Sequence, residues 1–161
     1  KKIIDLSADF RLEQVDQYEK RYGSKHLAPS LQEKAVYGLT EIYKEKIKEG
    51  SLVACTGCNS AATLYPIIPL LDEGVIKNSN LTINLGAGVS GAGRDAKQNI
   101  IHAEVSEGVK PYNIGTHRHI AELEQEFKKA TKNKIDITFV PHLLPQNRGV
   151  LVSIPIASPL S

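Results

Sequence analysis

The most informative stretch of the sequence is Leu52-Val53-Ala54-Cys55-Thr56-Gly57-Cys58-Asn59-Ser60. The apolar residues 52–54 are typical of a short buried strand, and the run 61–65 that follows the stretch favours a helix. Gly57 permits a sharp turn between the two elements. We therefore predict a strand, a tight turn and a helix that begins at Cys58.

Cys58 is the candidate nucleophile of this turn. A thiol at the first residue of a helix faces unpaired backbone N–H groups and the positive end of the helix dipole, and both favour the thiolate. The thiolate is the form of cysteine that attacks electrophiles. On composition alone, a small buried cysteine in an apolar segment is the competing interpretation, and the remaining motifs outweigh it.

The composition indicates one globular domain. The 161 residues are 41% hydrophobic and 24% charged, with a net charge of +2, which gives no reason to expect disorder or nucleic-acid binding. No apolar run approaches the roughly 20 residues of a membrane-spanning helix, and no signal peptide is apparent. Two cysteines three residues apart fit a reducing cytoplasm better than a secreted disulfide framework. Because the chain starts without methionine inside a predicted strand, we expect a piece of a longer protein.

The apolar patterns predict a mixed α/β or α+β fold. Strands are predicted at 2–6, 52–54, 81–85, 100–105, 135–140 and 150–156, and helices at 12–22, 41–49 with Thr40 as N-cap, from 58 onward, and 117–132. Pro66 and Pro69 are expected to kink the helix at 58 or to end it early. Several strands are expected to be antiparallel because their connections are too short for crossover helices.

A glycine-rich stretch, Gly86-Ala87-Gly88-Val89-Ser90-Gly91-Ala92-Gly93-Arg94, follows a predicted strand. Its glycines favour a backbone that lies close to a ligand, and Arg94 is placed to pair with a phosphate. The stretch has neither the Walker A pattern nor the Rossmann fingerprint. A flexible turn explains it equally well.

Two histidines flank an arginine in His117-Arg118-His119, at the predicted start of the last helix. Cationic side chains there oppose the helix dipole, so the pattern does not serve helix stability. The same field keeps an imidazole neutral, as a general base requires. A solvated helix start is the alternative, and the spacing disfavours a zinc site, so no metal is expected.

The segment 139–149 contains two prolines that fix an irregular link between strands. Asn147 and Arg148 are placed there to reach a ligand, although the segment alone is more typical of a structural turn. A charged strand exit at 5–12 also borders the predicted site.

Seven stretches, in order, give the chain a resemblance to the N-acetyl-gamma-glutamyl-phosphate reductases, which are of the aspartate-semialdehyde dehydrogenase type. They cover nearly the whole chain and lie at 4–12, 36–41, 57–58, 88–94, 107–112, 117–125 and 141–149. The resemblance implies the C-terminal catalytic domain of the glyceraldehyde-3-phosphate-dehydrogenase-like fold, with a mixed, largely antiparallel sheet and helices. It also implies that the N-terminal Rossmann domain is absent, with residues 1–54 bordering the missing NADP-binding domain and residues 55–161 forming the catalytic core.

The resemblance further implies the chemistry. The family reduces an acyl phosphate to an aldehyde with NADPH in arginine biosynthesis, and Cys58 would form a thioester with the substrate. The implied base is His117, with His119 behind it and Glu122 as orienting partner. The implied substrate ligands are Arg94, Arg118, Arg148, Asn147 and Tyr112, and the implied cofactor contacts are Ser90, Gly91, Ala92 and Gly93.

Two features depart from the family pattern. The family reads Pro-Gly-Cys followed by an aromatic residue and Pro-Thr, whereas this chain reads Thr56-Gly57-Cys58-Asn59-Ser60, and the resemblance does not account for Cys55.

Without the dinucleotide-binding half, we expect this chain to be inactive alone and to bind NADPH weakly or not at all. The resemblance also implies a dimer or tetramer formed through the sheet, and neither a membrane nor a nucleic acid as partner.

Two alternatives remain open on the sequence. Cys55 and Cys58 form a Cys-x-x-Cys pair, which is also typical of a redox or metal-binding module. Within the same chemistry, the substrate is alternatively an aminoadipyl or aspartyl phosphate, because the length of the substrate cannot be read from these residues.

Overall fold

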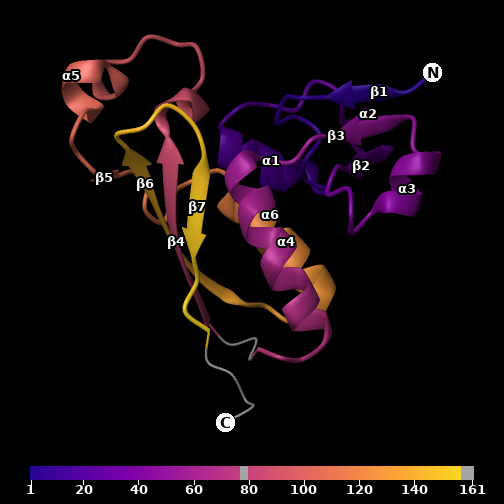
Figure 1. The fold of residues 1–161 in the computed structure, drawn as a ribbon. Coiled ribbons are helices and arrows are strands. Elements are labelled where there is room, and N and C mark those ends of the chain that lie inside the picture. The colour runs from indigo at the N-terminus through magenta and orange to yellow at the C-terminus, as the bar shows by residue number, and fades with distance from the viewer. Residues whose placement is uncertain (77–79, 157–161) are drawn as a thin grey trace.

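A computed structural model describes residues 1–76 and 80–156 and arranges them around two sheets (Figure 1). The first sheet has three parallel strands in the order β1 (Ile3–Asp5), β3 (Leu52–Ala54) and β2 (Ala35–Tyr37). Its connections contain the helices α1 (Val15–Tyr22), α2 (Pro29–Gln32) and α3 (Lys44–Glu49). All three residues of the central strand β3 are buried, which explains the apolar run at 52–54.

The second sheet has four strands in the order β5 (Lys110–Pro111), β6 (Asp136–Leu144), β4 (Asn80–Gly88) and β7 (Val150–Ser153). Strands β4 and β6 pair in parallel over nine residues, and β5 and β7 add antiparallel edges. The predicted mixed sheet is confirmed, and two of its three pairings are antiparallel, but its longest pairing is parallel. The helix α6 (Ile120–Thr131) lies in the connection from β4 to β6 and provides the crossover that parallel pairing needs.

The main core lies between this sheet and two helices that run side by side, α4 (Cys58–Asp72) and α6 (Figure 1). Burying each large apolar side chain contributes about 1.5–3 kcal/mol relative to exposure. The fully or nearly fully buried members include Leu64, Ile67, Ile83, Leu85, Leu123, Phe127 and Phe139. The predicted apolar face of α6, with Ile120, Leu123 and Phe127, is confirmed.

Helix α4 begins at Cys58 as predicted, but its prolines do not end it early. Pro66 and Pro69 lie inside a helix of 15 residues that continues to Asp72. Each proline removes one backbone donor from the helix. The burial of Ile67, Ile68 and Leu71 on either side of the prolines holds the segment helical.

Three other predicted elements are placed differently by the structure. Helix α3 begins at Lys44 rather than Glu41, because residues 39–43 form a turn in which the N–H groups of Ile42 and Tyr43 donate to Leu39 O. Residues 100–105 are not a strand but part of two short helices, η2 (Gln98–Ile100) and α5 (His102–Val105). Helix α6 begins at Ile120, so His117 and His119 precede it.

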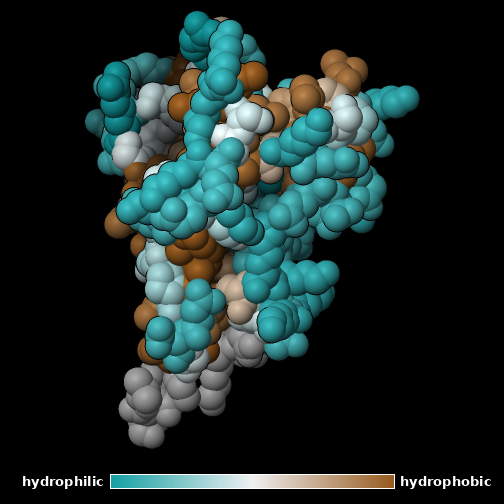
Figure 2. Space-filling view, turned by 90° about the vertical axis from the view of Figure 1, so that its right-hand side faces the viewer, coloured by the Kyte–Doolittle hydropathy of each residue, from teal (hydrophilic) through white to brown (hydrophobic). Residues whose placement is uncertain are grey.

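The surface seen in Figure 2 is mainly hydrophilic, with hydrophobic patches between the polar side chains. Large apolar side chains that are exposed in and next to β1 include Ile3, Ile4 and Leu6. Within residues 1–76 and 80–156, no helix has both the length and the apolar character needed to cross a membrane.

Candidate active site

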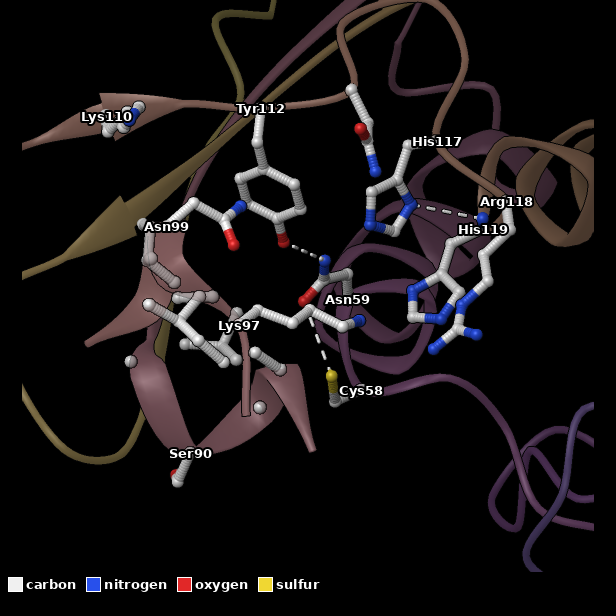
Figure 3. Close-up of a pocket in the computed structure, with 18 of the residues that line it drawn as sticks. Cys58, Asn59, Ser90, Lys97, Asn99, Lys110, Tyr112, His117, Arg118 and His119 are labelled. Atoms are coloured by element: carbon white, nitrogen blue, oxygen red, sulfur yellow. Dashed lines mark hydrogen bonds between the residues drawn. The ribbon is translucent and has the colours of Figure 1, made fainter. Parts of the chain in front are cut away.

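A cavity of about 620 Å³ lies at the start of α4 (Figure 3). Its volume is that of a site for one small ligand. Its walls come from the first turn of α4, the end of β4 with the short helix η1 (Val89–Ala92), the segment 97–100, and the segment 110–119. The polar residues that line it include Cys58, Asn59, Ser90, Lys97, Asn99, Lys110, Tyr112, Asn113, Thr116, His117, Arg118 and His119.

Cys58 is an exposed free thiol on this wall, at the first residue of α4 with Gly57 as N-cap. Its Sγ lies 3.4 Å from Oδ1 of the buried Asn59, and the Asn59 amide donates to the Tyr112 hydroxyl over 3.4 Å (Figure 3). The predicted strand, turn and helix are confirmed, and together they place an exposed thiol in the wall of the cavity. Cys55 is also free but only partly exposed, and it does not line the cavity.

Glu122, on the first turn of α6, anchors the turn that carries Cys58. This carboxylate is fully buried and accepts hydrogen bonds from the Tyr37 hydroxyl at 2.6 Å and from the Gly57 N–H at 3.0 Å. Burial and Glu122 raise the pKa of Tyr37, so its hydroxyl stays protonated and donates. Arg11 lies 3.5 Å from the same carboxylate and donates to Cys55 O at 2.7 Å. Arg11 and Glu122, from two segments distant in sequence, thus hold residues 55–57 in place, and Tyr37 holds Glu122.

His119 packs directly against this turn. Its Nε2 lies 3.9 Å from Glu122 Oε1, and a Cβ on Gly57 would come within 2.5 Å of the same nitrogen. Burial, followed by the charges of Arg11 and Arg118, lowers the pKa of His119 to about 3. The imidazole is therefore neutral at pH 7 and has one unprotonated ring nitrogen.

His117 is neutral as well, but its hydrogen bonding fixes its tautomer. Burial, followed by the charges of His119 and Arg118, lowers its pKa to about 4. Its Nδ1 accepts the backbone N–H of His119 at 3.1 Å, so the ring proton resides on Nε2. His117 therefore presents a donor at Nε2. The helix dipole was the predicted cause of neutrality, whereas both rings precede α6 and burial is the larger cause.

The structure brings together only part of the predicted ligand set. Arg118, Tyr112, Ser90, Gly91 and Ala92 line the cavity. Four others do not line the cavity: Gly93, Arg94, Asn147 and Arg148.

The segment 146–149 holds the glycine-rich loop through its backbone. Ser90 N–H donates to Asn147 O at 3.0 Å, and Gly88 N–H donates to Gly149 O at 2.9 Å. A Cβ on Gly88 would lie 2.7 Å from the Arg148 backbone nitrogen. At Gly88 the close neighbour is therefore protein backbone rather than a ligand, which corrects the prediction for that glycine.

Several residues of the site were missed by sequence reasoning. Arg11 and Tyr37 lie in stretches that carry the family resemblance, but nothing local indicates that they meet Glu122. Lys97, Asn99 and Lys110 line the cavity, and neither Lys97 nor Asn99 belongs to a motif. In the part of the chain that the structure describes, no three His, Cys, Asp or Glu side chains gather as a metal site would require.

Replacing Gly57 with alanine is expected to destabilise the fold by about 1–3 kcal/mol, the usual cost of overpacking a buried site. The new methyl would lie 2.5 Å from His119 Nε2 and 2.9 Å from Glu122 Oε1. Urea unfolding measures the change. Gly108→Ala is the matched control, because the nearest atom to its Cβ is 3.9 Å away. Equal stabilities of the two variants would contradict the contact between Gly57 and His119.

The stability of the protein is expected to fall as the pH is lowered from about 7 to 4. His117 and His119 have an ordinary pKa of 6.5 when unfolded and pKa values of about 4 and about 3 when folded. Below pH 6.5 the unfolded state therefore binds more protons, and each histidine contributes a slope of up to about 1.4 kcal/mol per pH unit. Urea unfolding across this range measures the slope, and a His117→Asn/His119→Asn variant should show a shallower one. An unchanged slope would contradict the buried, neutral state of the two rings.

Comparison with known proteins gives three consistent findings. Residues 58–159 match the family model described as semialdehyde dehydrogenase, dimerisation domain. Over 154 residues the chain is 53% identical to an N-acetyl-gamma-glutamyl-phosphate reductase of Cereibacter sphaeroides and 51% identical to one of Rhodobacter capsulatus. Each of these alignments covers 95% of this chain and 45% of the relative, so the chain spans about half the length of the curated relatives it matches.

Solved structures show the same fold at low sequence identity. Aspartate semialdehyde dehydrogenase II from Vibrio cholerae has a TM-score of 0.61 and 14% identity, covering 96% of this chain and 48% of that chain. Aspartate semialdehyde dehydrogenase with NADP from Candida albicans has a TM-score of 0.57 and 14% identity, covering 99% and 44%. These findings confirm the predicted resemblance and the predicted fold.

Proposed function

The chain belongs to the semialdehyde dehydrogenase family, and from this premise we propose that it carries the catalytic part of an N-acetyl-gamma-glutamyl-phosphate reductase. The reaction would be the NADPH-dependent reduction of N-acetyl-gamma-glutamyl phosphate to N-acetylglutamate semialdehyde, a cytoplasmic step of arginine biosynthesis. The observation that carries the proposal is the meeting of the exposed thiol of Cys58 with His117, Arg118 and His119 in one cavity. Identity above 50% to reductases of that name supports the choice of substrate.

In the first step, Cys58 attacks the carbonyl carbon of the acyl phosphate. A bond forms from Sγ to that carbon, the bond from the carbon to the phosphate oxygen breaks, and phosphate leaves with the electron pair. The product is a thioester on Cys58. Unpaired N–H groups at the start of α4 favour the negative sulfur and the oxyanion that develops beside it.

The geometry favours His119 over His117 as the proton acceptor, which reverses the order given by the sequence. His119 is neutral and touches Gly57, the residue before the nucleophile. His117 carries its proton on Nε2, so it suits the role of hydrogen-bond donor to the substrate carbonyl. Glu122 would orient His119 and keep the nucleophile turn in place.

The cavity would take only the reactive end of NADP. Its volume of about 620 Å³ has to take the substrate as well, and Ser90, Gly91 and Ala92 form one wall near Cys58. A Cβ on Gly91 would meet open space, so a ligand is able to approach that part of the loop. Ser90, Gly91, Ala92 and Gly93 would border the nicotinamide, and bound NADPH would supply the hydride that reduces the thioester. Most of the cofactor would be held outside this cavity.

The two sheets support a proposed division of the chain. Residues 1–54 form the parallel sheet and would border the NADP-binding part, whereas residues 55–161 would form the catalytic and dimerisation core. The chain would form a homo-oligomer, either a dimer or a tetramer, and the match to a dimerisation-domain family supports this.

A phosphate-release assay tests the proposal. The expected inactivity of the chain alone concerns the reduction, which needs bound NADPH, and not the acylation of Cys58. When the chain is mixed with N-acetyl-gamma-glutamyl phosphate, about one phosphate per chain should be released in a rapid burst, without NADPH, because acylation precedes reduction. Aspartyl and aminoadipyl phosphates are the matched competitors. A faster burst with either of them would reassign the substrate, and the absence of a burst with all three would reject the acyl-phosphate reductase.

The Cys-x-x-Cys redox module is the second candidate function, and the position of Cys55 outside the cavity disfavours it. A redox module would cycle between a dithiol and a disulfide of Cys55 and Cys58. Thiol counting after mild oxidation and reduction distinguishes the two candidates.

A further inference from the structure

The cations that line the cavity are mostly not the ones that the sequence motifs indicated. Lys97, Lys110 and Arg118 line it, whereas no aspartate or glutamate does. Among the described residues, none of these three side chains forms a hydrogen bond or an ion pair, in contrast to the paired Lys129 and Arg21. Three unpaired cations around one small cavity constitute a site for a ligand with more than one negative charge.

Lys97 differs from the other two cations in its position. It lies in the connection between η1 and η2, on the wall opposite the 117–119 segment. Figure 3 shows its side chain extended across the cavity toward the side where Cys58 and His119 lie, while Lys110 stands at the far end beside Tyr112. Its four-carbon stem lets the ammonium follow a group that moves during a reaction.

We propose that Lys97 holds the phosphoryl group of the acyl phosphate at Cys58 and stabilises the phosphate as it leaves. The assignment rests on the proposed function. When the carbon–oxygen bond breaks, the departing phosphate gains negative charge, and an ammonium beside it lowers the barrier to that step. Arg94 and Arg148, the predicted phosphate ligands, do not line the cavity. The negative charge of the departing phosphate is therefore stabilised by Lys97 together with Arg118.

Two alkylating reagents of different charge test the site without any substrate. Iodoacetate is an anion and iodoacetamide is neutral, and both modify the thiolate of Cys58. In Lys97→Met the ratio of the iodoacetate rate to the iodoacetamide rate should fall roughly tenfold, the effect of one charge a few ångströms away at a protein surface. Lys97→Arg should retain most of the ratio. Lys34→Met is the control, because Lys34 is exposed and does not line the cavity.

Inorganic phosphate provides the second readout. It should slow the iodoacetamide reaction of the wild type and of Lys34→Met, and should lose most of this effect in Lys97→Met. Far-UV circular dichroism verifies that the variants are folded. An unchanged reagent ratio and unchanged phosphate protection in Lys97→Met would overturn the proposal.

The acyl-phosphate burst separates this inference from the proposed function. A burst of equal rate in the wild type and in Lys97→Met would leave the reductase standing and reject the role of Lys97. A loss of the reagent ratio without any burst in the wild type would support a phosphate site at Lys97 and reject the reductase. A burst slowed roughly tenfold or more in Lys97→Met alone supports both.

Discussion

Replacing Cys58 with serine is expected to slow phosphate release from N-acetyl-gamma-glutamyl phosphate by on the order of 10⁴-fold or more, because a hydroxyl is a far weaker nucleophile than a thiolate. Cys58 is the exposed thiol of the cavity, and the turn before it is fixed by Glu122. A single-turnover phosphate assay measures the rate, and the fold of the variant should be unchanged because serine is nearly the same size.

Cys55→Ser is the matched control for this experiment. Cys55 lies three residues away, is partly buried and does not line the cavity. Its replacement should change the rate by no more than a few-fold. If both variants lost activity to the same degree, the two thiols would act as a pair, and the assignment of Cys58 as the sole nucleophile would fail.

Replacing Glu122 with glutamine is expected to lower the free energy of unfolding by about 3 kcal/mol, because it leaves the buried guanidinium of Arg11 without its charged partner. The carboxylate accepts hydrogen bonds from Tyr37 and Gly57 and lies 3.5 Å from Arg11. An amide keeps the shape but loses the negative charge, and its NH₂ group faces one of these donors. Urea unfolding monitored by circular dichroism measures the change.

Glu124→Gln is the control for the same experiment. Glu124 is two residues away and pairs with Arg21 at 3.0 Å, but its side chain is 48% exposed. Exposed ion pairs contribute about 0–1 kcal/mol, so this variant should stay close to the wild type. Similar losses in the two variants would show that burial of Glu122 among its donors is not what stabilises the turn.

The local elements of the fold could be read from the sequence where one face of an element is consistently apolar. Strand β3, the start of α4 at Cys58 and the apolar face of α6 follow from short-range periodicity. Residues 100–105 were misread as a strand, although Ile101 and Val105 are one helical turn apart and only Val105 is buried. The continuation of α4 past Pro66 depends on packing from other segments, which no local pattern records.

In the candidate site, too, local motifs could be read from the sequence, whereas contacts between distant segments could not. Cys58, His117, Arg118 and His119 stand in recognisable motifs, and the structure places all four in one cavity. The tautomer of His117 and the contact of His119 with Gly57 arise from tertiary packing. Lys97 lines the cavity from the connection between η1 and η2, and the sequence contains no signal for that arrangement.

The most direct test of the central claim is peptide mapping of the wild-type chain after a brief reaction with N-acetyl-gamma-glutamyl phosphate. The account predicts one N-acetylglutamyl group on the peptide that contains Cys58, bound as a thioester that hydroxylamine removes, together with one released phosphate. An unmodified Cys58, or an acyl group found only on other residues, would contradict the assignment of Cys58 as the nucleophile of an acyl-phosphate reductase.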